Sequence, residues 1–234
     1  VEVPEALLTH TASTGGLAEL DINPSGMIML TAHHSGGVYI YRRHPQEQEW
    51  RTTVLPFDVW QVRLSLDING RVHLVYTEPE THDKIYAFES EGRWIHEPIL
   101  GYDRFSIEEF CMLQGVFPVV HMHDSGSIPG DCYWHEEYFV IRTDSGAFEL
   151  IQEIGHEGVM AVSMDYRSLD ILCQMGSIGY LVNFFDGIHH SVSYSLSDLG
   201  LHVGQLCLGA VTSDGCITVA SKSNKYYGVI RGCP

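Results

Sequence analysis

The stretch VRLSLDINGRVHLVYTEPETHDKIYAFESEGRW, Val62 to Trp94, contains four short runs in which apolar residues alternate with polar ones. Alternation with a period of two is typical of half-buried β-strands. The first two runs are separated by Asn69-Gly70, a dipeptide that favours a tight hairpin turn. The last two are separated by the turn Ser90-Glu91-Gly92. The stretch therefore predicts a four-stranded antiparallel meander.

The same pattern recurs along the chain at spacings of roughly 40–50 residues, the period of propeller blades. The copies span residues 15–55, 59–100, 102–154, 156–196 and 200–232. The fifth copy lacks its fourth strand, while a spare apolar segment, residues 3–10, precedes the first. We therefore expect residues 1–234 to form one all-β domain, a five-bladed β-propeller whose ring is closed by the N-terminal strand. A β-sandwich is the alternative, but it does not explain the regular period.

Two segments of the template carry a resemblance to a known class of repeat. The run LDINGRVHLVY, Leu66 to Tyr76, resembles the repeats of sialidase-like (BNR-type) propellers. The turn SEGRW, Ser90 to Trp94, is similar to a worn form of their Asp-box, which has Asp before the Gly and Thr before the Trp. The resemblance implies architecture only. Five-bladed relatives by shape include tachylectin-like lectins and arabinanase-like glycosidases, so function has to be argued from the site.

Composition excludes several classes of partner. The net charge of −17 disfavours nucleic acid and anionic membrane surfaces, which attract Lys and Arg. No apolar run approaches the length of a membrane span, and the start of the sequence does not read as a signal peptide. We expect a soluble protein, either intracellular or secreted with its signal removed. The cysteines form no C-x-x-C pair, and Cys132 and Cys233 are the two that would pair in an oxidising compartment.

Histidines gather in the loops that should form one end of the propeller. These loops enter the first strand of each blade or join its second and third strands. Half of the 14 histidines fall there: His33, His34, His82, His123, His135, His156 and His202. Imidazole serves both acid–base chemistry near neutral pH and metal ligation, so this face is the predicted binding face.

The motif VHMHD, Val120 to Asp124, places two histidines two residues apart. On a strand, His121 and His123 then point to the same side. This spacing suits two ligands of a divalent metal, or a base with its orienting partner. A structural role is the third interpretation of the motif.

Carboxylates and aromatic residues complete the predicted face. Glu19, Glu108 and Glu109 lie near strand starts, where glycosidases place their acid and base. Blade two carries Arg63 where a glycosidase needs Asp, which argues against that class. Trp60 precedes the second blade, and Trp134 lies in the long irregular loop of the third, where an aromatic ring is suited to stacking on a ligand.

The blades differ in their face residues, so the sequence favours one asymmetric site over repeated lectin sites. We expect an enzyme that uses His/Tyr general acid–base chemistry on a carbohydrate or small polar ligand, in an elimination, isomerisation, cyclisation or hydrolysis. A polysaccharide lyase is the concrete version. A lectin-like binder without catalysis and a protein-interaction propeller are the alternatives. The candidate catalytic residues are His121, His123, His156, Arg63 and Tyr76, and the candidate binding residues are Glu19, His33, Trp60, Arg104, Glu108, Trp134 and His202.

Overall fold

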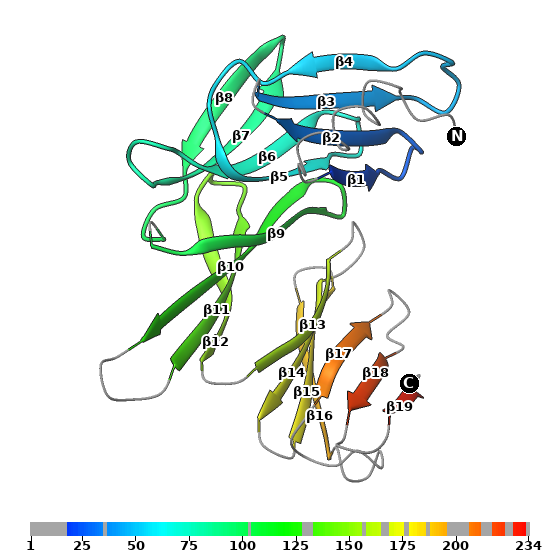
Figure 1. Ribbon diagram of the computed structural model, residues 1–234, viewed down its shortest axis with the longest axis vertical. Helices are drawn as coiled ribbons and strands as arrows, with labels where there is room; N and C mark the ends of the chain where they lie inside the picture. The colour runs from blue at the N-terminus through cyan, green and yellow to red at the C-terminus, as the bar shows by residue number, and fades with distance from the viewer. Residues whose placement is uncertain are drawn as a thin grey trace.

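The computed structural model describes residues 18–34, 37–102, 104–127, 133–155, 158–164, 169–175, 178–185, 188–195, 206–211, 217–222 and 227–232. Side chains are described within residues 19–33, 37–102, 104–124 and 137–151. The described residues form 19 β-strands in five sheets (Figure 1). They contain no helix long and apolar enough to cross a membrane.

Four sheets have four strands each, and the fifth has three. The first sheet comprises β1 (Ala18–Ile22), β2 (Ile28–His34), β3 (Gly37–Arg43) and β4 (Arg51–Val54). The second comprises β5 (Trp60–Leu66), β6 (Val72–Thr77), β7 (Lys84–Ser90) and β8 (Arg93–Pro98). The third comprises β9 (Ser106–Leu113), β10 (Phe117–Ser127), β11 (Tyr133–Arg142) and β12 (Phe148–Gly155). The fourth comprises β13 (Gly158–Met164), β14 (Leu169–Met175), β15 (Ile178–Phe185) and β16 (Ile188–Ser195). The fifth comprises β17 (Leu206–Val211), β18 (Ile217–Lys222) and β19 (Tyr227–Gly232).

Each sheet is an antiparallel meander in which neighbouring strands follow one another in sequence. The first strands contact one another in succession, β1 with β5, β5 with β9, β9 with β13 and β13 with β17. Figure 1 shows the resulting row of sheets, with β1 and β17 far apart in it. The all-β prediction with four-stranded antiparallel sheets is confirmed. Ring closure stays a prediction, because its closing segment, residues 3–10, lies outside the described residues.

Two apolar layers hold the first three sheets together. One lies between the first and second sheets and contains Ile40, Leu64 and Leu74. The other lies between the second and third sheets and contains Tyr86 and Met122. Every residue of β6 is buried, because its sheet has a neighbour on both faces. This burial on both sides explains why Val75 is apolar although it faces away from Val72, Leu74 and Tyr76.

The turns after the first strands are joined by hydrogen bonds between sheets. Asn23 Nδ2 donates to the Asp67 carbonyl at 2.9 Å, which links the first and second sheets. The Ile68 amide donates to the Gly115 carbonyl at 2.9 Å, which links the second and third. The Asp67 carboxylate also accepts the amides of Asn69 and Arg71, both at 2.8 Å, and so fixes the Asn69-Gly70 turn.

A β-bulge recurs near the start of the first strand in sheets two to five. The register shifts at Gln61–Val62 in β5, at Glu108 in β9, at Met160 in β13 and at Cys207 in β17. A bulge breaks the alternation of side chains, so that successive residues reach the same side. In β9 both Glu108 and Glu109 are exposed as a result. Bulges are common beside functional sites, and these four lie at the predicted binding face.

Substitution of Gly115 tests how closely the second and third sheets approach one another. Its φ is +70°, and a Cβ there would lie 2.9 Å from Ile68 Cβ and 3.2 Å from the Ile68 amide nitrogen. Gly92 is a matched control, with φ +74° and nothing within 4 Å of an added Cβ. We expect Gly92→Ala to cost about 1–2 kcal/mol of unfolding free energy through backbone strain alone. Gly115→Ala should cost about 1–3 kcal/mol more, because it forces the sheets apart.

Urea unfolding of both variants and the wild type measures this difference. Equal losses for the two variants would contradict a close contact at Gly115.

Candidate active site

Two histidines of β10 share one carboxylate from β11. His121 Nε2 lies 2.8 Å from Glu137 Oε2, and His123 Nδ1 lies 2.9 Å from Glu137 Oε1. The antiparallel register places His123 directly opposite Glu137. His121 lies opposite Phe139, two residues along on the same face of the sheet. The expectation that His121 and His123 share a side is consistent with this geometry, and Glu137 is their common partner.

The surroundings of the pair are partly desolvated. The His121 side chain is 8% exposed and stacks on Phe139, with ring centroids 4.4 Å apart and planes 8° from parallel. The His123 side chain is 23% exposed, so it is the more accessible of the two. Burial raises the pKa of Glu137, but the hydrogen bonds and charges of His121 and His123 outweigh it, and the pKa lies below its ordinary value.

A second polar group joins the first strands of sheets one to three. Arg63 Nη1 is 3.3 Å from Glu19 Oε1, and Arg63 Nε donates to the Glu108 carbonyl at 2.8 Å. Arg63 therefore bridges β1, β5 and β9. Burial raises the pKa of Glu19 above its ordinary value even though Arg63 lowers it. His33 lies near the same guanidinium, and burial together with the Arg63 charge lowers its pKa.

Glu109 connects the two groups. It is the register partner of His121 across β9 and β10. Desolvation is the largest influence on the pKa of Glu109 and raises it. The charges of His121 and Arg63 lower this pKa and that of Glu108 raises it, so that the pKa lies above its ordinary value. The site therefore places a carboxyl with a raised pKa next to an imidazole that is hydrogen-bonded to the Glu137 carboxylate.

The use of His121 and His123 as metal ligands stays a prediction. No group of three His, Cys, Asp or Glu residues around one point occurs among the residues that the structure describes. One ring nitrogen of each histidine, Nε2 of His121 and Nδ1 of His123, is directed at Glu137. The metal interpretation of the VHMHD motif gains no support from this geometry.

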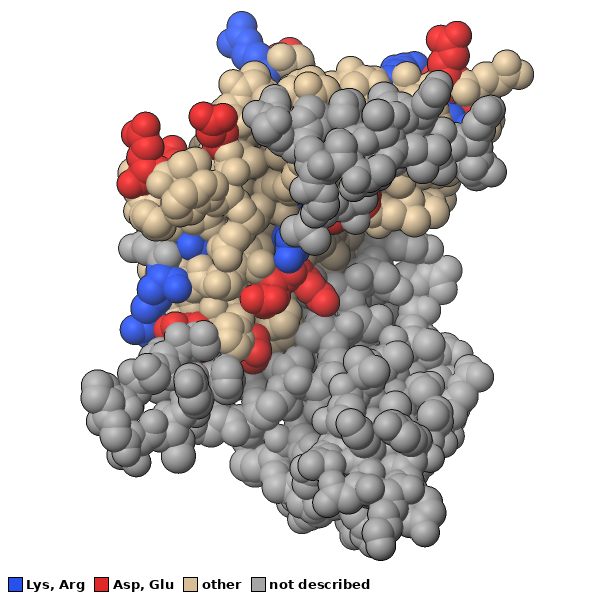
Figure 2. Space-filling model, viewed as in Figure 1, with Lys and Arg blue, Asp and Glu red and all other residues tan. Residues whose placement is uncertain are grey.

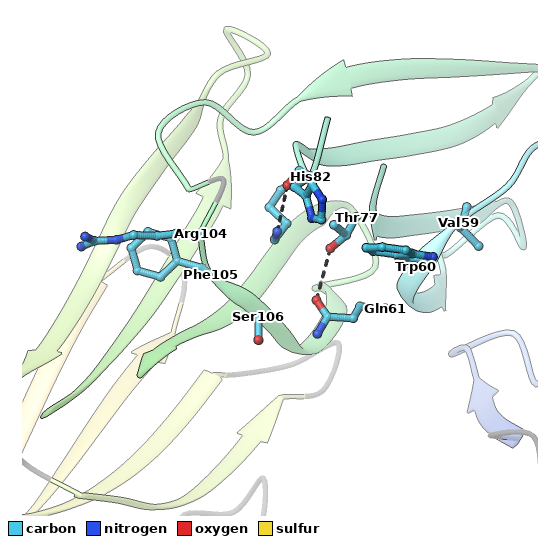
Figure 3. Close-up of a pocket in the computed structure, with 9 residues that line it drawn as sticks. Val59, Trp60, Gln61, Thr77, His82, Arg104, Phe105 and Ser106 are labelled. Carbon is cyan, nitrogen blue, oxygen red and sulfur yellow. Dashed lines mark hydrogen bonds between the residues drawn. The ribbon is translucent and has the colours of Figure 1, made fainter. Parts of the chain in front are cut away.

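An open pocket of about 670 Å³ lies between the second and third sheets at the same end (Figure 3). Its lining residues come from the loop into β5, the β6–β7 connection and the start of β9: Val59, Trp60, Gln61, Thr77, His82, Lys84, Arg104, Phe105 and Ser106. Trp60 and Arg104, both predicted to bind ligand, are among them. Ser106 is also the register partner of His123, so pocket and histidines adjoin.

The remaining predicted site residues are placed differently. Tyr76 is buried in the apolar layer between sheets one and two, and its hydroxyl lies 3.1 Å from His96 Nδ1. The structure does not bring it to the histidine pair. His156 and His202 lie outside the described residues, as do Cys132 and Cys233, and the Trp134 side chain is outside the described side chains.

Sequence reasoning missed Glu137 and Lys84. Glu137 lies at the end of the long irregular segment, and only the β10–β11 register reveals which residue faces His123. Lys84 opens β7 directly after the loop that carries His82 and Asp83. The sequence did single out Lys84, since it is one of only three lysines in the chain.

Comparisons with known proteins show the fold class. No protein-family model matches the chain, and no curated protein sequence matches it. The structure is similar to that of a puromycin hydrolase, with a TM-score of 0.59 and 13% identity over 100% of this chain and 40% of that one. It is also similar to the polysaccharide lyase Uly1, with a TM-score of 0.53 and 8% identity over 92% of this chain and 57% of that one.

The chain therefore spans between two fifths and three fifths of the length of these two enzymes. At these identities the likeness concerns the fold alone. Both neighbours have a β-propeller-like arrangement of four-stranded antiparallel sheets, and this chain shares it.

The lowered pKa of Glu137 predicts how stability depends on pH. A carboxyl whose pKa falls on folding contributes stability above its unfolded value, here 4.5, and that contribution disappears as the pH falls through the folded value. We expect Glu137→Gln to be less stable than the wild type at pH 6–7, with the gap closing below about pH 4.

Thermal unfolding between pH 3 and 7 measures this gap. Glu149→Gln, an exposed change on β12 of the same sheet, is the control and should show no such trend. A gap that is independent of pH would contradict the assigned hydrogen bonds.

Proposed function

We propose that this protein is an enzyme that moves protons to and from a carbohydrate or small polar ligand at the Glu137-bound histidines. The observation that carries the proposal is the carboxylate of Glu137 within hydrogen-bonding distance of both His121 and His123. A carboxylate that holds one imidazole nitrogen fixes the tautomer and raises the basicity of the other nitrogen. The enzymes of similar fold support an enzymatic role without specifying the reaction.

His123 is the proposed base. With Nδ1–H donated to Glu137, the neutral ring carries its lone pair on Nε2, and Glu137 then stabilises the imidazolium that forms. His121, which is more deeply buried, holds Glu137 in position from its other oxygen. Glu109, whose pKa is raised, is the proposed acid that returns a proton to the departing group.

Arg63 supplies a fixed positive charge that acts on Glu109, the proposed acid. Its guanidinium is oriented by Glu19 and by the Glu108 carbonyl, so it needs little reorganisation when negative charge develops on a substrate. An acid, a base and a cation are the groups that elimination, isomerisation and hydrolysis share. Elimination from an acidic sugar uses all three, because the cation stabilises the anion that forms when a proton is removed beside a carboxyl group.

A binding function without catalysis is the second candidate. It is favoured by Trp60, which is 51% exposed at the edge of the pocket although tryptophan is mostly buried in folded proteins. Exposed aromatic faces of this kind bind sugar rings in enzymes and lectins alike. Turnover assays separate the two candidates.

The test of the acid–base proposal compares His123→Gln and Glu137→Gln with the wild type and with Glu149→Gln. Each protein is incubated with a panel of neutral and acidic polysaccharides, and release of reducing ends and ultraviolet absorbance of unsaturated products are followed. We expect a fall in kcat of about 10²–10⁴-fold for His123→Gln. Glu137→Gln should lose activity too, because an amide no longer accepts both N–H groups.

Glu149→Gln should retain full activity. A wild type that binds members of the panel but converts none of them would support the lectin-like alternative. Full activity in His123→Gln would overturn the assignment of the base.

We further propose that the five sheets are the blades of one five-bladed propeller with worn BNR-type repeats, closed by residues 3–10 alongside β19. The three-stranded fifth sheet and the succession of first-strand contacts support this. Removal of residues 1–14 should then lower the unfolding midpoint, because it leaves a sheet edge unpaired. Removal of residues 1–2 is the control, and equal stability of the two truncated chains would contradict closure by this segment.

A further inference from the structure

Trp60 lies at the entrance of β5 with much of its indole ring in solvent. The side chain is 51% exposed, although tryptophan is mostly buried in folded proteins. The other exposed large apolar residues among the described side chains are aliphatic. In that part of the chain, Trp60 is therefore the one Trp, Phe or Tyr ring that a ligand can reach freely.

A β-bulge turns Trp60 away from the apolar layer between the first and second sheets. Val62 and Leu64 face that layer, and regular alternation along β5 would add Trp60 to it. The extra residue between Trp60 and Arg63 reverses the side, so that Trp60 pairs with Thr77 and faces the third sheet. An indole that the sequence pattern would bury is thereby placed at the pocket between the second and third sheets (Figure 3).

This bulge contains a strained residue. Gln61 has a φ of +43°, a left-handed conformation that is unfavourable for a residue with a Cβ. The bulge at Glu108 in β9 contains no residue with positive φ, so the strain is particular to β5. Thr77 Oγ1 donates to Gln61 Oε1 at 3.2 Å and helps to hold the strained conformation. Backbone strain of this kind is found preferentially at functional sites.

His82 supports the indole from the β6–β7 loop. The two rings lie edge to face, with centroids 5.2 Å apart and an interplanar angle of 72° (Figure 3). The loop is fixed by two backbone hydrogen bonds of 2.9 Å, from the His82 amide to the Glu78 carbonyl and from the Glu78 amide to the Asp83 carbonyl. The ring of Trp60 is therefore oriented before a ligand arrives, which lowers the entropic cost of binding.

Charge does not single out a ligand for this pocket. Lys84 donates to the His82 carbonyl at 3.1 Å, and Arg104 is paired with Asp124 at 2.7 Å. In Figure 3 the Arg104 side chain points away from Trp60. Figure 2 shows acidic and basic side chains interspersed over the described part of the face that it presents. The uncovered face of the indole is therefore the feature that a ligand would contact.

We propose that this pocket binds a sugar ring by stacking its C–H face on Trp60, so that ring shape and not charge is recognised. Gln61 and Ser106 line the same space of about 670 Å³ and supply polar atoms for the hydroxyl groups. Ser106 is also the register partner of His123, so a sugar chain held on Trp60 can extend toward the candidate base. The inference rests on the proposed function for that role, while binding itself is measured without turnover.

The experiment is calorimetric titration of the full chain with three uncharged trisaccharides, of glucose, galactose and mannose. These sugars differ in which hydroxyl groups are axial, and so in the C–H face that they offer. We expect at least one of them to bind, with an affinity that changes less than about twofold as NaCl is raised, because the contact is not between charges. The bound sugar should also protect tryptophan fluorescence from quenching by acrylamide, because it covers the indole of Trp60.

Trp60→Ala should weaken binding about tenfold or more and remove the protection from acrylamide. Ile95→Ala, which shortens an exposed apolar side chain on β8, is the control and should bind as the wild type does. Gln61→Gly should weaken binding several-fold, because glycine lets the bulge take other conformations and releases the ring. Glu91→Gly, at another left-handed position, is its matched control and should leave binding unchanged. Thermal unfolding midpoints check that each variant is folded.

No binding of any of the three sugars, binding that Trp60→Ala leaves unchanged, or an affinity that falls steeply with salt would each overturn the inference. Equal binding by Gln61→Gly and Glu91→Gly would overturn the role of the bulge. These outcomes are distinct from failure of the acid–base proposal. Turnover that is lost in His123→Gln, with no sugar bound at Trp60, would leave the enzyme and remove this pocket. Binding at Trp60 with no turnover would keep the pocket and remove the enzyme.

Discussion

The contact between the first strands of neighbouring sheets is the constraint on which the rest of the structure depends. At the turn end it is made by Asn23 with Asp67 and by Ile68 with Gly115. At the opposite end Arg63 joins Glu19 to the backbone of Glu108. The partners lie 44 to 47 residues apart, which is the spacing of the sequence repeat. The repeat is therefore the interval that brings equivalent positions of successive sheets into contact.

The sequence predicts the fold much better than it predicts the site. Turn dipeptides such as Asn69-Gly70 and period-two alternation are local signals, and each sheet is built from consecutive strands, so local signals suffice. The alternation of Val72, Leu74 and Tyr76 also contains the information that Tyr76 faces the core. The pairing of His123 with Glu137 is different in kind. It depends on the register across a long irregular hairpin, and no local pattern fixes that register.

Part of the charge of this acidic protein is paired between sheets. Several arginines are used between sheets, as in the pairs Arg42–Glu89 and Arg142–Glu97. Charges more than about 8–10 Å apart are largely screened at physiological ionic strength. The net charge of −17 therefore acts on a charged ligand mainly during its approach, while the pairing of nearby groups decides the local electrostatics of a site.

The bulges at the starts of the first strands have a consequence for how such a protein diversifies. A bulge inserts one extra residue, so the side chains before it point to the opposite side of the sheet from the one that regular alternation would give. The residues after it keep their register with the neighbouring sheet. Mutation on the entry side of Gln61 or Glu108 can therefore alter the ligand-facing surface without moving the turn end, where the sheets are joined. In the first strands that carry a bulge, the half after it maintains the scaffold, and the half before it is open to the evolution of new specificity.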